Sequence, residues 1–78
     1  MNRAEIEAGL TEILSTVLAH PVPSSLKRSE EAGWDSLKHM QIIFAVEAKF
    51  GVQFTEEEIP KLDSFGQLLE SLQKRHAP

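Results

Sequence analysis

The sequence predicts an all-α protein, a small four-helix bundle built from three main helices and one short helix. Three observations support this class. Apolar residues recur at helical spacing in three segments, polar residues able to cap a helix precede those segments, and no segment shows the alternation of a half-buried strand. With 78 residues, 41% of them hydrophobic, the chain can form one modest core. We therefore expect a single domain over residues 1–78.

The first helix is expected over about residues 2–19. Asn2 can cap its start, and Glu5 stands three residues later, at the spacing of a capping box. One apolar face follows, formed by Ile6, Leu10, Ile13, Leu14, Val17 and Leu18. Proline disfavours helical conformation in the residue before it, so Pro21 is expected to end this helix.

A long connection follows over residues 20–34. Loops of this length are uncommon in compact domains unless they are anchored or carry function. Most of its residues are polar, and the apolar side chains of Val22, Leu26 and Trp34 are the expected anchors. Gly33 fits a sharp turn before the next helix.

The second main helix is expected over about residues 36–50 and ends at Gly51, a typical residue just past a helix C-terminus. Two groups of apolar residues follow helical spacing in it: Leu37, Met40, Phe44 and Ala48, and also Ile42, Ile43, Val46 and Phe50. Together they predict a helix buried on more than one side, at the centre of the bundle.

Two further helix starts follow. Thr55 and Glu58 form a second capping-box pattern, which opens a short helix over about residues 55–60 that Pro60 limits. Ser64 and Gln67 form a third such pattern and open the last helix, over about residues 64–75. Its apolar face is formed by Phe65, Leu68, Leu69 and Leu72.

Composition excludes several functional classes. A formal net charge of −4 argues against nucleic acid as the main partner, and the lack of cysteine excludes disulfides and thiolate metal sites. No apolar run approaches the length of a membrane span and no signal peptide is visible, so we expect a cytoplasmic protein without a membrane partner. His20, His39 and His76 lack metal-ligand spacing, so no metal site is expected. No catalytic constellation is present, and we expect a protein that is not an enzyme.

The segment Gly33-Trp34-Asp35-Ser36-Leu37 joins the long loop to the second main helix. Helix starts expose unpaired N–H groups and a partial positive charge, so a phosphate on the Ser36 hydroxyl would lie at a favourable anion position. We interpret Ser36 as a covalent attachment point. The alternative is that Ser36 or Asp35 only caps the helix.

The chain resembles the acyl carrier protein family, of the stand-alone type. The resemblance is carried by Asp35-Ser36-Leu37 at a helix start near mid-chain, in a domain of the family's length, and by Phe50-Gly51-Val52 followed by an acidic turn. It implies that a phosphopantetheinyl transferase attaches 4′-phosphopantetheine to Ser36, whose arm then carries acyl groups as thioesters. It also implies roles for Asp35 in the transferase reaction, through a metal ion bound there, and for Leu37 in enzyme recognition, in a monomer.

The resemblance further implies that partner enzymes contact the second helix and the acidic turn after it, through Leu37, Lys38, Met40, Gln41, Glu47, Glu56 and Glu57. Carriers of bulk fatty-acid synthesis are usually more acidic on the second helix, where Glu47 is the only acid here. We therefore expect a specialised pathway, of fatty-acid or polyketide type, with its own loading ligase and downstream enzymes. An aminoacyl or peptidyl carrier is the closest alternative. A helical adaptor with an unmodified Ser36 is a further one.

Three more residue roles follow. Trp34 is interpreted as a loop anchor, with contact to the arm as the alternative, and His39 as a solvated surface residue, with contact to the phosphate as the alternative. Phe44, Phe54 and Phe65 are expected to place rings between the helices, which would leave little room for a long acyl chain and favour a short or polar cargo. The alternative is that these rings only fill the core.

Overall fold

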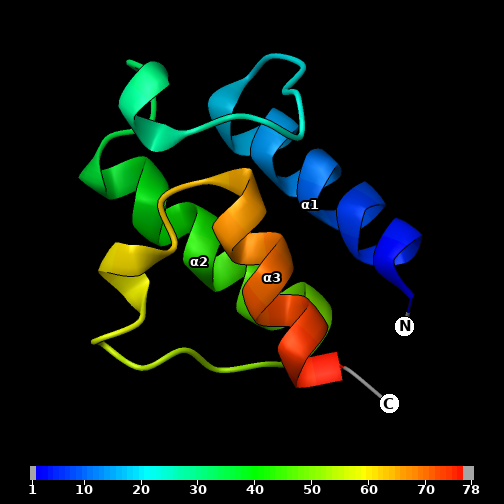
Figure 1. The fold of residues 1–78 in the computed structure, drawn as a ribbon. Coiled ribbons are helices and arrows are strands. Elements are labelled where there is room, and N and C mark those ends of the chain that lie inside the picture. The colour runs from blue at the N-terminus through cyan, green and yellow to red at the C-terminus, as the bar shows by residue number, and fades with distance from the viewer. Residues whose placement is uncertain (1, 77–78) are drawn as a thin grey trace.

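The computed structural model describes residues 2–76, apart from the side chain of His76, and in that range it is all-α, as predicted. The helices are α1 (Arg3–Leu18), α2 (Ser36–Phe50) and α3 (Phe65–His76), with short 3₁₀ turns η1 (Arg28–Glu30) and η2 (Ile59–Lys61). The only β feature of the described residues is an isolated bridge between Lys27 and Ser64. The backbone of α1 lies close to α2 and also close to α3. Figure 1 shows the arrangement of the three helices.

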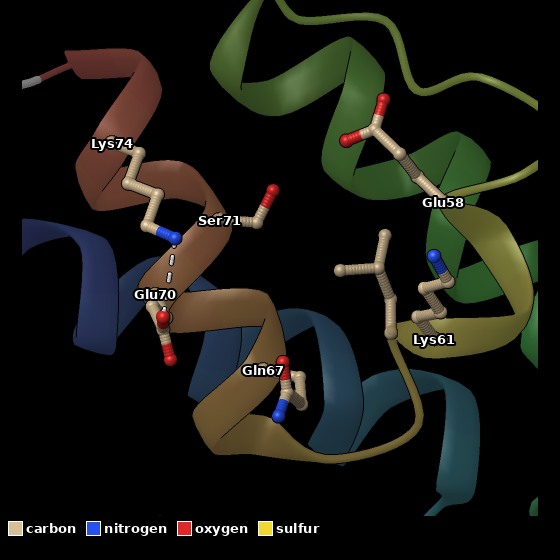
Figure 2. Close-up of a pocket in the computed structure, with 7 residues that line it drawn as sticks. Glu58, Lys61, Gln67, Glu70, Ser71 and Lys74 are labelled. Atoms are coloured by element: carbon tan, nitrogen blue, oxygen red, sulfur yellow. Dashed lines mark ion pairs between the residues drawn. The ribbon is translucent and has the colours of Figure 1, made fainter.

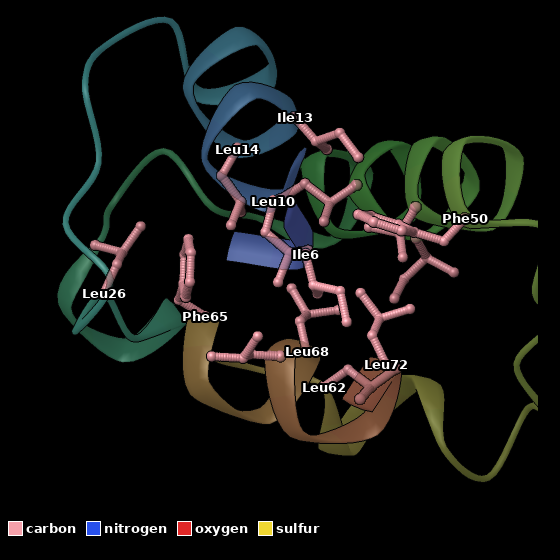
Figure 3. Close-up of a cluster of buried hydrophobic side chains, with 14 of the residues drawn as sticks. Ile6, Leu10, Ile13, Leu14, Leu26, Phe50, Leu62, Phe65, Leu68 and Leu72 are labelled. Carbon is pink, nitrogen blue, oxygen red and sulfur yellow. The ribbon is translucent and has the colours of Figure 1, made fainter. Parts of the chain in front are cut away.

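The hydrophobic core lies between the three helices. The apolar stripe predicted on α1 is buried at Ile6, Leu10 and Leu14, and that on α3 is buried at Phe65, Leu68 and Leu72 (Figure 3). Leu26 and Trp34 enter the same core from the long loop, and Val22 packs against it half-buried, so the three predicted loop anchors are confirmed. Burial of these side chains supplies the main driving force for folding.

The predicted cap residues are found at their helix ends. At α1, the Asn2 side chain accepts a hydrogen bond from the Glu5 N–H at 2.8 Å and the Glu5 carboxylate accepts one from the Asn2 N–H at 3.3 Å. At α3, the Ser64 hydroxyl accepts a hydrogen bond from the Gln67 N–H at 3.0 Å. Gly51 ends α2 in the left-handed region, with φ of 65°.

The short helix predicted over residues 55–60 is wrong in its bounds. Thr55 opens a single turn in which its carbonyl accepts hydrogen bonds from the Glu58 and Ile59 N–H groups, and the 3₁₀ turn η2 follows at Ile59–Lys61. Pro60 has no N–H with which to continue an α-helical ladder, so the turn tightens instead of lengthening.

The prediction that the second helix is buried on more than one side is also wrong. One face of α2 is buried, formed by His39, Ile42, Ile43, Val46 and Phe50. The side chains of Leu37 and Phe44 are 66% and 60% exposed. Phe54 and Phe65 are buried as expected, but Phe44 does not lie between helices and gives no support to the cargo argument.

Glycine at position 9 allows close packing of α1 against the end of α2. A Cβ atom at Gly9 would lie 2.6 Å from Cζ of Phe50 and 3.0 Å from Cε of Lys49. The lysine stem can move, but the buried Phe50 ring cannot move without disturbing the core.

We predict that Gly9→Ala lowers the free energy of unfolding. The gain in helix propensity is about 1 kcal/mol, and overpacking of a core contact costs about 1–3 kcal/mol. Urea denaturation followed by circular dichroism measures the net effect. The matched control is Gly66→Ala, where the nearest atom, Ser64 Oγ, would be 3.9 Å from the new Cβ, and we expect no loss there. Equal stability of the two variants would contradict the prediction.

A charged contact ties the turn before η2 to the end of α3. Glu58 accepts a hydrogen bond from the Thr55 N–H at 3.1 Å and pairs with the Arg75 guanidinium, which also lies over the Phe54 ring at 4.9 Å from its centroid. The ionised form of Glu58 is favoured most by the hydrogen bond from the Thr55 N–H and next by that from Arg75. The pKa of Glu58 therefore lies below its ordinary value of 4.5.

We predict that this contact stabilises the protein at neutral pH and loses its effect in acid. Since the pKa is lowered on folding, the stabilisation is complete above about pH 4.5 and is lost as the pH falls through the folded-state value. Urea denaturation should therefore give a higher free energy of unfolding for wild type than for Glu58→Gln at pH 7, and this gap should narrow towards pH 3. Glu57→Gln, at an exposed neighbour without a bonding partner among the described residues, is the control. A gap independent of pH would refute the assignment.

Candidate functional site

Ser36 is the first residue of α2, and its side chain is exposed. The cap is supplied by Asp35, whose backbone is extended and whose Oδ1 accepts a hydrogen bond from the Lys38 N–H at 2.8 Å. The Ser36 hydroxyl is therefore not used in capping. Figure 1 shows the start of α2 at the end of the molecule opposite the start of α1 and the end of α3. The position leaves the hydroxyl open to a modifying enzyme.

The backbone at the start of α2 has free donors. The His39 N–H donates to the Asp35 carbonyl at 2.8 Å and the Lys38 N–H to the Asp35 side chain, whereas the N–H groups of Ser36 and Leu37 have no acceptor within the described part of the chain. Unpaired N–H groups at a helix start favour a nearby anion.

Arg28 is a site residue that the sequence analysis did not identify. Its Nε donates a hydrogen bond to the Trp34 carbonyl at 3.1 Å, and its Nη2 donates to Ser36 Oγ at 3.4 Å. Arg28 precedes Ser36 by eight residues within a polar loop, and no sequence pattern marks it. Only the fold of that loop brings its guanidinium to the hydroxyl.

A buried hydrogen-bonded pair fixes the backbone just before Asp35. Trp34 is 2% and His39 4% exposed, and the Trp34 indole N–H donates to His39 Nδ1 at 2.9 Å. Because an indole nitrogen can only donate, Nδ1 must accept, so the His39 proton lies on Nε2 and is donated to the Ile59 carbonyl at 2.8 Å. The interpretation of Trp34 as a loop anchor is confirmed. That of His39 as a solvated residue is wrong, because the indole and carbonyl satisfy it in the interior.

The residues predicted to contact partner enzymes occupy different settings. Leu37 and Gln41 are exposed on α2, whereas Lys38 and Met40 are half-buried. Glu47 is half-buried and accepts a hydrogen bond from the Phe54 N–H at 2.9 Å, so it also holds the chain that follows α2. Glu56 and Glu57 are exposed in the turn before η2. The His39 bond to the Ile59 carbonyl ties η2, which directly follows the acidic turn, to α2.

A hollow of about 270 Å³ lies between η2 and α3 (Figure 2). Its charged groups are largely paired with protein groups, as in the ion pair of Lys74 with Glu70 at 3.3 Å and that of Glu58 with Arg75. Within residues 2–76, no group of three or more potential metal ligands is found. In the same range no helix is long and apolar enough to span a bilayer.

Two comparisons with known proteins show what the chain is similar to. A family model described as "Phosphopantetheine attachment site" matches residues 8–72. The chain is also 30% identical over 69 residues to a protein named acyl carrier protein from Acidothermus cellulolyticus, in an alignment that covers 85% of this chain and 82% of that relative. Both matches include Ser36 and the elements packed around it.

We predict that His39→Leu destabilises the fold by about 1–3 kcal/mol, because it leaves the buried Trp34 N–H without an acceptor. The Ile59 carbonyl keeps a hydrogen bond from the Leu62 N–H at 3.2 Å, so the loss is centred on the indole. Urea denaturation followed by circular dichroism measures it, with His20→Gln, at an exposed histidine, as control. In wild type, ¹⁵N NMR should find the His39 proton on Nε2. A proton on Nδ1 would contradict the hydrogen-bond assignment.

Proposed function

Because the chain belongs to the acyl carrier protein family, whose shared feature is a phosphopantetheine attachment site, we propose that Ser36 carries the 4′-phosphopantetheine arm. Members of this family are carriers and not enzymes, and they interact with a phosphopantetheinyl transferase and with biosynthetic enzymes. The observation that carries the proposal is the exposed Ser36 hydroxyl at the first position of α2, next to a cap supplied by Asp35.

The residues around Ser36 fit a phosphate-linked group. The N–H groups of Ser36 and Leu37 lack acceptors in the described range, and the Arg28 guanidinium reaches Ser36 Oγ. A phosphodiester on that oxygen would be an anion beside a helix N-terminus, which is worth about 0.3–1 kcal/mol at an exposed position. Asp35 is occupied as the cap through Oδ1, and its other carboxylate oxygen has no hydrogen-bonding partner among the described residues.

The arm supplies a thiol on which an acyl group can be held as a thioester. The chain itself has no cysteine, so no protein thiol competes for that group. The protein's own part is to hold the attachment residue rigidly at one end of the fold. Trp34 is fixed by its buried hydrogen bond to His39. Asp35, the residue just before Ser36, is fixed by the hydrogen bond that it accepts from the Lys38 N–H.

The exposed face of α2 supports a docking role for enzymes of a specialised pathway. Leu37 and Phe44 present apolar side chains to solvent, with Met40 half-buried between them in sequence. Large apolar side chains on the exposed face of a helix offer contact area to a partner protein. Lys38 and Gln41 add basic and neutral polar groups to this helix, while Glu47, Glu56 and Glu57 add acids at its far end and in the acidic turn. We assign these residues to recognition of partner enzymes.

The same surface is also compatible with an aminoacyl or peptidyl carrier, which is the alternative class. This surface has few acids, whereas a bulk fatty-acid carrier is expected to have a strongly acidic second helix. In either class the loading enzyme is a ligase that forms the thioester on the arm. The adaptor alternative differs from both in leaving Ser36 unmodified, and the mass measurement below separates it.

We predict that incubation with coenzyme A and a broad-specificity phosphopantetheinyl transferase adds the mass of one phosphopantetheine to the protein. Intact-protein mass spectrometry measures the gain, and peptide mapping should place it on Ser36. Ser36→Ala should show no gain, because the accepting hydroxyl is missing. Ser24→Ala, at an exposed serine in the loop of residues 20–34, should be modified like wild type. A full gain in Ser36→Ala, or none in wild type, would reject the proposal.

A further inference from the structure

The Arg28 side chain is held at a fixed position beside the attachment residue. Its backbone N–H donates to the Asp63 carbonyl at 2.8 Å, its Nε donates to the Trp34 carbonyl at 3.1 Å, and its Nη2 reaches Ser36 Oγ at 3.4 Å. The first two contacts fix both ends of the side chain to backbone that is itself tied to the core. The half-buried guanidinium is therefore ordered before any modification takes place.

The charge of this guanidinium is not neutralised within the described part of the chain. None of the ion pairs found there includes Arg28. Glu31 pairs with His20 at 3.1 Å and Asp35 Oδ1 accepts from the Lys38 N–H, and neither acid forms an ion pair with the guanidinium. Arginine stays protonated at all relevant pH values. A permanent positive charge is thus directed at an uncharged hydroxyl.

From this arrangement we propose that Arg28 binds the phosphodiester formed on Ser36 and fixes the root of the arm against the loop of residues 20–34. The proposal rests on Ser36 being the attachment site. A contact of 3.4 Å to a neutral hydroxyl is a weak hydrogen bond, whereas a phosphate on the same oxygen brings anionic oxygens to the same donor. Guanidinium-to-phosphate bonds are among the stronger charge-assisted bonds, and the planar fork can engage two oxygens.

Lys38 is the competing cation, because it lies two residues after Ser36 on α2 and has no ion-pair partner in the described range. Its ammonium sits on a flexible stem and has no bond that directs it to Ser36, whereas the guanidinium of Arg28 is already in place. Preorganisation favours Arg28, because binding then costs less side-chain entropy. The two residues can be separated by matched substitutions.

The experiment compares apo and loaded protein for wild type, Arg28→Gln, Lys38→Gln and Lys27→Gln. Lys27→Gln removes the same charge from the same loop at an exposed position and is the control. Loading is verified by mass, and thermal unfolding is followed by circular dichroism. If Arg28 holds the phosphate, loading should raise the unfolding temperature of wild type by about 2–4 °C more than that of Arg28→Gln, as expected for one exposed charge pair in a domain of this size. Lys38→Gln and Lys27→Gln should respond like wild type.

A second measurement needs no variant. In wild type labelled with ¹⁵N, the Arg28 Nε–Hε resonance should shift on loading and its hydrogen exchange should slow, because the guanidinium gains an anionic acceptor. Verified loading without these changes, or an equal thermal response in wild type and Arg28→Gln, would overturn the role of Arg28 and leave the attachment at Ser36 standing. Loss of the response in Lys38→Gln alone would assign the phosphate to Lys38 and also overturn the proposal. Absence of loading in wild type would overturn both proposals together.

Discussion

The hydrogen bonds from the buried Trp34 indole to His39, and from His39 to the Ile59 carbonyl, are the contacts on which the geometry of Ser36, the proposed attachment residue, depends. They join the loop before α2, the first turn of α2 and the turn η2. A buried indole N–H without an acceptor is costly, so the imidazole cannot be exchanged for an apolar group of similar size without penalty. Because Trp34 is fixed, the next residue, Asp35, is placed where it can cap α2, and Ser36 is the residue directly after this cap.

Backbone hydrogen bonds join the long loop to the start of α3, and this explains how a long loop can hold Arg28 at a precise position. Leu26 and Arg28 pair with the start of α3, where the Phe65 N–H donates to the Leu26 carbonyl at 2.9 Å and the Arg28 N–H donates to the Asp63 carbonyl. The loop is therefore held by backbone hydrogen bonds as well as by its apolar anchors. Arg28 reaches the hydroxyl because of this pairing, so the positive charge beside Ser36 depends on the docking of α3.

Burial of one face of α2 leaves two large apolar side chains on its exposed face. Leu37 and Phe44 are large, apolar and exposed, and they contribute little to the core. In a carrier that must be recognised by several enzymes in turn, such residues offer contact area without strong dependence on salt. The proposed division of labour is that the buried face of α2 holds the attachment residue still, while the exposed face meets the partner enzymes.

The sequence by itself determined the helical class, the bounds of the three main helices to within one residue, and the position of Ser36 at a helix start, because capping residues and apolar periodicity act locally. The tertiary structure alone decided which side of α2 is buried. Both apolar groups of residues 36–50 follow helical spacing, and the stripe that enters the core includes His39, a polar residue whose burial is possible only because Trp34 donates to it and Ile59 accepts from it. The role of Arg28 could not be predicted from local sequence patterns either, because the hydrogen bond from its backbone N–H to the Asp63 carbonyl brings the side chain to Ser36.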